Sequence, residues 1–343
     1  MDFKFIFIKL MENNIENINQ TNEIEEEKEI LCLTKIDNNL KLAIGLSNSI
    51  ITFYNQNLTK KIGIIKDQPS YFLFELSGKT NKNGIKLLCC SYSFQIKILE
   101  IIFKNDNKIE YNTLYIIEPN ESRNEINKAI EINNENKDIV SIDDQNVIIY
   151  RKNKEINKYM EIKKINAESA NDILNLNENM FCVSLKNKGI LQFYNNKDFS
   201  LINEIKKIES FGSNNYLCKL NENILCVGGF EYISLIDIDF EQVNNKMELL
   251  KNRERITSTC GVIENRWLIV GTKYKDNINS EFLFDIIVYK LNNDNVLQEI
   301  KRFQNAHDKI INSIIYINGN IISCSEDKKI KKWSLSELIN LKK

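Results

Sequence analysis

One group of side chains in this sequence has the residue types of a hydrolytic triad. His307 is the only histidine of the chain, and Ser323 and Asp327 follow it in the same stretch. A serine nucleophile, a histidine base and an orienting carboxylate together support acyl transfer when they are in hydrogen-bond contact. Whether these three side chains meet, and whether a substrate could reach them, depends on the elements that carry them.

A second motif with possible chemistry is Ser77-Gly78-Lys79-Thr80, which has the residues that end a phosphate-binding loop. That loop requires a glycine five positions before Gly78, where this chain has Leu73, and it stands before a helix. Here the segment lies between two apolar runs typical of strands. We interpret it as a hairpin turn.

Acidic pairs and cysteines offer little further chemistry. Asp143–Asp144 and the pair Asp237/Asp239 could bind a cation or exchange protons, but both stand where turns between strands are expected. None of the eight cysteines has the CxxC spacing of a zinc or redox site, and most lie in apolar runs. We expect buried, reduced cysteines, no metal, no cofactor and a cytoplasmic location.

Charge and hydropathy exclude other classes of function. The chain has 46 Lys and Arg against 47 Asp and Glu, so no overall positive field attracts phosphates, and nucleic acid is a disfavoured partner. No window contains the roughly 20 uncharged apolar residues that cross a bilayer, so we expect no membrane insertion.

The elements that must position these residues form a repeat. In the last unit, two apolar strands surround a tight turn at Asp327 and end on Trp333. Similar strand–turn–strand endings recur at a mean spacing of about 46 residues, near the ~40–45 of propeller blades. Their closing positions are Tyr54, Leu99, Tyr150, Tyr194, Ile236, Tyr289 and Trp333.

This period predicts an all-β fold, a single β-propeller of about seven four-stranded blades, although six or eight blades would also fit. A β-sandwich pair needs no such regular period. Helical periodicity is weak, and its best candidates, Glu23 to Leu33 and Leu335 to Leu341, lie at the ends.

The predicted domain organisation places the propeller at residues 25–333, a closing strand with an Asn- and Glu-rich connection at 1–24, and a tail at 334–343. A propeller removes its exposed edge when a strand from the opposite terminus completes the last blade. The predicted closing strand is Phe3 to Leu10.

The last unit resembles the repeat of the Trp-Asp (WD) family. That repeat has a Gly-His near its start, a Ser-x-Ser-x-Asp turn and a closing Trp, and this chain matches it with His307, Ser323, Asp327 and Trp333. It departs at Ala306, where the family has Gly, and at Ser334, where it has Asp. The resemblance implies that the four matching side chains form a buried hydrogen-bond network instead of a catalytic triad.

The resemblance also implies a rigid disc that presents loops on two faces and holds other proteins together. We therefore predict a protein-interaction scaffold or adaptor that is not an enzyme. One alternative is an enzyme that uses carboxylates in the channel, against which the mainly apolar inner strands argue. Another is a structural subunit of a larger trafficking or ciliary assembly, which would expose an apolar patch.

Two segments are candidates for contact with a partner. Arg253, Arg255 and Trp267 lie in the densest arginine segment and could anchor a protein, although a solvated loop is the alternative. The hairpin 272–285 is longer than a turn requires, so it carries either function or a neutral insertion.

Overall fold

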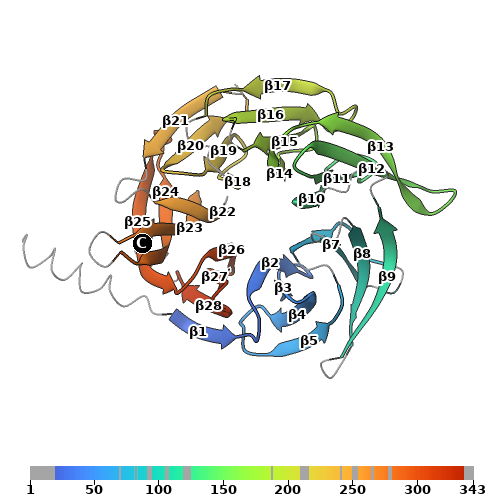
Figure 1. The fold of residues 1–343 in the computed structure, drawn as a ribbon, viewed down its shortest axis with the longest axis horizontal. Coiled ribbons are helices and arrows are strands. Elements are labelled where there is room, and N and C mark those ends of the chain that lie inside the picture. Colours follow the sequence, from blue (N-terminus) through green and yellow to red (C-terminus); the bar gives the residue numbers. More distant parts are fainter. Residues whose placement is uncertain are drawn as a thin grey trace, which may run out of the picture.

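The chain forms a ring of seven four-stranded antiparallel sheets around a central axis, as Figure 1 shows. The predicted seven-bladed all-β propeller is therefore confirmed. This computed structural model describes residues 20–68, 71–80, 82, 84–90, 95–104, 108–118, 125–186, 188–208, 216–239, 242–248, 254–262, 264, 266–276 and 280–335.

Each blade runs from an inner strand beside the axis to an outer strand at the rim. In chain order, blades one to three contain β2 (Ile30–Ile36), β3 (Lys41–Leu46), β4 (Ile50–Asn55) and β5 (Lys61–Ile65); β6 (Phe72–Leu76), β7 (Ile85–Cys90), β8 (Ile96–Phe103) and β9 (Ile109–Ile117); and β10 (Lys128–Glu131), β11 (Ile139–Ile142), β12 (Asn146–Asn153) and β13 (Lys158–Asn166).

Blades four to seven follow the same order, except that the last takes its outer strand from the start of the chain. They contain β14 (Ala170–Asn175), β15 (Met180–Leu185), β16 (Ile190–Asn195) and β17 (Leu201–Ile205); β18 (Tyr216–Lys219), β19 (Ile224–Gly228), β20 (Tyr232–Asp237) and β21 (Gln242–Glu248); β22 (Arg255–Val262), β23 (Trp267–Lys275), β24 (Phe282–Leu291) and β25 (Leu297–His307); and β26 (Ile311–Ile317), β27 (Asn320–Ser325), β28 (Lys329–Ser334) and β1 (Gln20–Glu25).

The predicted closing residues all lie in the third strand of a blade, from Tyr54 in β4 to Trp333 in β28. This strand has neighbours on both sides within its sheet, and its apolar side chains pack between blades. The core consists of seven apolar clusters, and the fully buried members of each come from two adjacent blades. No blade can therefore bury its faces without its neighbours.

The closing strand is β1, not the predicted Phe3 to Leu10, which lies outside the described residues. β1 pairs with β28 so that Ile24 faces Ile330, while Glu23 faces Lys331 and Glu25 faces Lys329. Glu23 also forms ion pairs with Lys329 at 3.3 Å and Lys331 at 3.6 Å.

The alternating Glu-Ile-Glu of β1 thus complements the Lys-Ile-Lys of β28, because opposite charges directly across a sheet attract. Phe3 to Leu10 carries Lys4 and Lys9, which would set like charges against this lysine-rich strand. The helix considered for Glu23 to Leu33 is also wrong, since these residues belong to β1 and β2. Of Leu335 to Leu341, only Leu335 lies within the described residues.

A recurring position near the end of each inner strand links it to the preceding blade. The backbone N–H of Asp37 donates to Glu75 Oε2 at 3.0 Å, that of Ser77 to Glu131 Oε1 at 3.2 Å, and that of Asn133 to Asn175 Oδ1 at 3.2 Å. In blades five, six and seven this position holds Lys219, Gly261 and Tyr316. We call it the junction position.

At the junction position of blade six, glycine permits backbone contact. A Cβ added to Gly261 would lie 1.8 Å from the carbonyl oxygen of Lys219, and backbone cannot give way as a side chain does. The junction of blade six with blade five therefore requires glycine.

We predict that Gly261→Ala lowers the free energy of unfolding by about 3 kcal/mol or more, because the methyl group forces two blades apart. Urea unfolding followed by circular dichroism measures this loss. The control is Gly78→Asn, since Gly78 has φ +75° in an open turn and asparagine tolerates that region. Equal stability of Gly261→Ala and the wild type would show that the blade five–six contact is incorrect.

Candidate functional site

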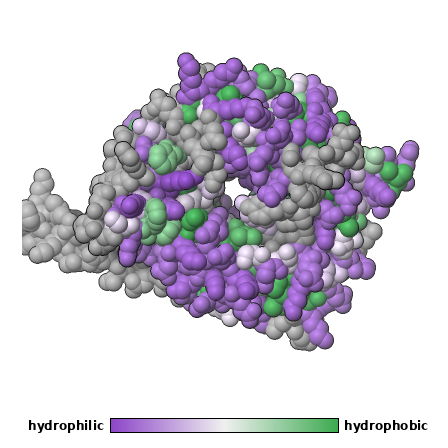
Figure 2. Space-filling view, viewed as in Figure 1, coloured by the Kyte–Doolittle hydropathy of each residue, from purple (hydrophilic) through white to green (hydrophobic). Residues whose placement is uncertain are grey.

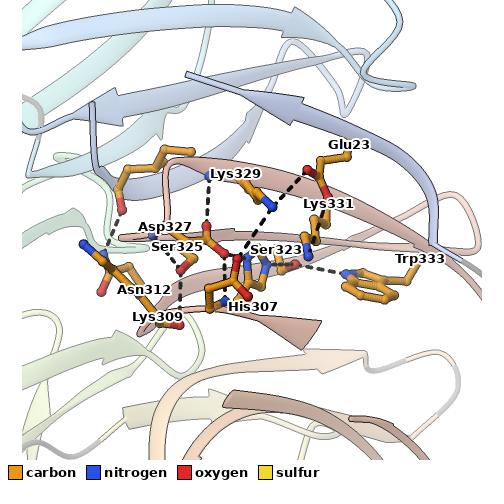
Figure 3. Close-up of polar contacts among 12 residues, drawn as sticks. Glu23, His307, Lys309, Asn312, Ser323, Ser325, Asp327, Lys329, Lys331 and Trp333 are labelled. Carbon is orange, nitrogen blue, oxygen red and sulfur yellow. Dashed lines mark hydrogen bonds and ion pairs between the residues drawn. The ribbon is translucent and has the colours of Figure 1, made fainter. Parts of the chain in front are cut away.

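The four residues of the predicted network meet where the end of β25 lies against β27 and β28 of blade seven (Figure 3). His307 Nδ1 is 2.8 Å from Asp327 Oδ2, and His307 Nε2 is 2.8 Å from Ser323 Oγ. Trp333 Nε1 donates to Ser323 Oγ at 3.0 Å. Since the ionised carboxylate of Asp327 can only accept, the proton of the neutral imidazole lies on Nδ1, and Nε2 accepts from the hydroxyl of Ser323.

These distances are those of a serine-hydrolase triad, but the surroundings rule out attack on a substrate in the folded state. Ser323 is 0% exposed and His307 is 2% exposed, so no carbonyl can approach Oγ. Trp333 occupies the position beside Oγ that an attacked carbonyl would need. The network is therefore a polar brace that ties β25, β27 and β28 together.

Burial sets the charge state of this brace. Burial lowers the pKa of His307 because the imidazolium would lose its hydration, and the contact with Asp327 opposes this only in part. Burial also disfavours ionised Asp327, but the hydrogen bonds from His307 and from the backbone N–H groups of Asp308 and Lys329 outweigh it and hold the pKa at about 2. At neutral pH the brace is a neutral imidazole beside a carboxylate.

The contact between blades seven and one has a polar brace of its own, made of different residues. Glu26 directly follows the outer strand of blade seven, near the place that His307 has at the end of the outer strand of blade six. It is 7% exposed and accepts a hydrogen bond from Tyr54 Oη. Lys61 Nζ lies 3.0 Å from both carboxylate oxygens of Glu26. Tyr54 occupies the position in β4 that Trp333 has in β28, so a direct Tyr–Glu bond replaces the longer network.

Blade six contains a buried ionic cluster that the sequence did not reveal. Arg302 Nη1 lies 2.6 Å from Glu254 Oε1 and 3.1 Å from Asp285 Oδ2, and these carboxylates are 1% and 0% exposed. Although burial disfavours its charge, hydrogen bonds to Glu254 and Glu299 and their negative charges raise the pKa of Arg302. The available signal was composition: only six of the 46 basic residues are arginine, and arginine suits bonds to two carboxylates better than lysine does.

The predicted partner-binding residues do not form one surface. Arg253 lies outside the described residues. Trp267 is 3% exposed and packs edge-on against Tyr316 with 6.1 Å between ring centroids, so it belongs to the core between blades six and seven and is removed from the candidate surface. Arg255 begins β22 and is partly exposed.

The long hairpin instead brings other exposed residues beside Arg255. Arg255 pairs with Lys273 of β23 and forms a backbone bridge with Phe230. Lys273 Nζ lies 4.1 Å from the centroid of the Phe282 ring, and Phe230 and Phe282 are 43% and 54% exposed. We call these four residues, Phe230, Arg255, Lys273 and Phe282, the hairpin strip.

A concave site lies among the inner strands β2, β6, β10 and β14. It is a cavity of about 990 Å³, which we call the channel pocket. Residues of the turns after β2 and β6 line its rim, among them Asn38, Ser77 and Lys79, so the predicted turn at Ser77-Gly78-Lys79-Thr80 is confirmed and forms part of this pocket. Glu75 and Glu131 line it as well, which corrects the expectation of a mainly apolar channel wall.

Two further findings concern the described residues only. No group of three or more His, Cys, Asp or Glu side chains there is arranged to hold a metal ion. No helix in the same ranges is long and apolar enough to cross a membrane.

All eight cysteines are free, and seven of them are buried.

The brace predicts a pH dependence of stability. His307 has a lower pKa when folded than its ordinary 6.5, so its contribution is complete above pH 6.5 and declines as pH falls toward the folded-state pKa. Asp327, lowered from 3.8 to about 2, adds a further loss only between about pH 4 and 2.

Because His307 is the only histidine, His307→Gln should flatten the slope of unfolding free energy against pH between 7.5 and 5. Urea unfolding at intervals of half a pH unit measures both slopes. An unchanged slope in the variant would show that His307 is not held neutral by burial.

Comparison with solved structures identifies the fold. The Cps50 (Swd1) β-propeller domain of Myceliophteria thermophila aligns with a TM-score of 0.68 at 13% identity, over 93% of this chain and 99% of that one. Raptor of Chaetomium thermophilum gives 0.69 at 13% identity, over 93% of this chain and 28% of that one. The RRP9 WD40 repeats give 0.67 at 10% identity, over 91% and 96%.

No family model matches the sequence, and a search of curated proteins finds no match. At these identities the structural likeness defines the fold alone. Seven four-stranded blades, closure by β1 and the His–Ser–Asp–Trp brace show that the chain has the fold of the WD40 β-propellers.

Proposed function

We propose that this propeller is a non-catalytic platform that binds other proteins with side chains at the ends of its blades. The observation that carries the proposal is the contrast between two sites. The Ser–His–Asp set is sealed and braces a blade, whereas turns from several blades converge on an open pocket of about 990 Å³. The fold supports the same role, which is the one that the resemblance to WD repeats implies.

We also propose that the partners are proteins and that the platform acts in the cytoplasm. Free, mostly buried cysteines are consistent with a reducing compartment. The balance of 46 basic and 47 acidic residues gives no overall attraction for nucleic acid. Figure 2 shows mainly hydrophilic residues around the central opening, a composition suited to reversible contacts.

A second candidate function, a structural subunit of a larger trafficking or ciliary assembly, is supported by the rim. Ile116 of β9, Met160 and Ile162 of β13, and Leu201 and Ile202 of β17 are between 42% and 54% exposed. These residues lie on the outer strands of blades two, three and four. Exposed apolar side chains that gather into one patch mark a surface that a partner covers in an assembly.

An enzyme that uses channel carboxylates has weaker support. Glu75 and Glu131 line one pocket, as such an enzyme requires. Each, however, accepts a hydrogen bond from the backbone of the preceding blade with one carboxylate oxygen. A catalytic acid or base would have to keep this structural bond throughout its proton transfers.

The platform predicts that stoichiometric proteins co-purify with the tagged chain from its native cells, as identified by quantitative mass spectrometry. A variant of the hairpin strip, Arg255→Ser with Phe282→Ser, should lose any partner held there, because it removes one cation and one exposed ring. The control is Lys154→Ser with Val296→Ser, which removes an exposed cation and an exposed apolar side chain at other turns.

Recovery of no reproducible protein with any form of the chain would contradict the platform. Loss of a partner with both the strip variant and the control would show that the strip is not its specific binding surface.

A further inference from the structure

The channel pocket contains two glutamates, Glu75 and Glu131, and the charge of Lys79 acts on Glu75 without forming an ion pair with it. Glu75 and Glu131 occupy the junction positions of blades two and three, where each holds a backbone N–H group with one oxygen. The second oxygen of each carboxylate is left for another donor. Within the described ranges, neither glutamate forms an ion pair.

The lysines of the pocket are already used. Lys128 Nζ lies 2.6 Å from Asp172 Oδ1 and 5.3 Å from the centroid of the Phe72 ring. Lys79 Nζ lies 2.8 Å from Asp37 Oδ1. An anionic ligand would have to displace these aspartates, so the pocket does not suit an anion.

A cation would instead meet a carboxylate whose lost hydration is not fully replaced by contacts within the chain. Burial raises the pKa of Glu75, because its carboxylate gives up hydration and the contacts it gains do not fully replace it. A cationic group that contacts Glu75 would supply the missing stabilisation.

The remaining lining suits the stem of a long side chain. Leu33, Phe74, Ile130 and Leu174 contribute apolar surface beside the two carboxylates. Arginine and lysine bury their methylene groups against such surface and keep the charged head on a polar group. Lys128 shows that the pocket accommodates a basic side chain, since its charged head lies over the ring of Phe72 and on Asp172.

The size and rim of the pocket indicate a peptide segment, not a small ion. Its volume of about 990 Å³ is at the upper end of ligand sites and exceeds one side chain. Asn38 and Asn133 also line it, and their amide groups can donate to and accept from the backbone of an extended chain.

From these observations we infer that the channel pocket binds an arginine or lysine side chain of an extended segment in a partner protein, with Glu75 and Glu131 as its ion-pair acceptors. This inference rests on the proposed platform function and names its binding surface. Blade one carries Lys35 at the junction position, and blades four to seven carry Asn175, Lys219, Gly261 and Tyr316, so the two acids lie on one side of the channel and orient the segment.

The test uses random dodecapeptides displayed on phage and selected on the folded full-length chain. Selected peptides are then synthesised and titrated by isothermal calorimetry against the wild type and against Glu75→Gln with Glu131→Gln. Glutamine keeps an acceptor oxygen for the N–H groups of Asp37 and Ser77, and thermal unfolding verifies that the variant is folded. The control is Glu168→Gln with Glu222→Gln, which removes two exposed carboxylates elsewhere.

We expect the wild type and the control to select peptides with an Arg or Lys next to apolar residues. Affinity should fall at least tenfold in the Glu75→Gln, Glu131→Gln variant and when the basic residue of the peptide becomes alanine. Selection of peptides without a basic residue, or equal affinity for the double variant, would overturn the inference.

Native co-purification separates this inference from the platform on which it rests. If proteins co-purify equally with the wild type and the Glu75→Gln, Glu131→Gln variant, the platform stands and the channel pocket is not its binding site. If neither form recovers proteins and no peptide is selected, the platform itself fails.

Discussion

Closure of the ring is the constraint on which the rest of this structure depends. Every apolar cluster of the core is shared by two adjacent blades, including the cluster between blades seven and one. A gap at one place would expose two blade faces. The pairing of β1 with β28, with isoleucine facing isoleucine and glutamate facing lysine, joins the two ends of the chain and prevents that loss.

Closure also explains where the polar brace is needed. Blade seven takes strands from both ends of the chain, and it carries the His307–Ser323–Trp333 network with Asp327 in its turn. Blade one uses Glu26 with Tyr54, and blade six uses Arg302 with Glu254 and Asp285. These solutions share one principle: a buried polar group is stable only when each donor and acceptor has a partner.

The structural and the proposed functional sites differ in whether their polar groups all have partners within the chain. Residues that could attack a substrate are enclosed, and they bond to one another across blades six and seven. The acids of the channel pocket are only half satisfied, since each uses one oxygen to hold the neighbouring blade. A rigid surface with carboxylate oxygens available for a ligand is suited to binding a partner without catalysis.

The sequence by itself determined the repeated all-β pattern of about seven units and the residues of the brace, because these depend on local signals: alternation of apolar residues, turn residues and one repeat with complete spacing. Only the tertiary structure decided what lies across blades. It buried Trp267 against Tyr316, joined Arg302 to residues of two other segments, and brought Glu75 and Glu131 into one pocket. Such contacts depend on how blades pack around the axis, and residues far apart in the chain leave no local pattern. The closing strand depends on both kinds of information. Its Glu-Ile-Glu pattern is present in the sequence, but it identifies the strand only once the Lys-Ile-Lys strand is known to be its neighbour.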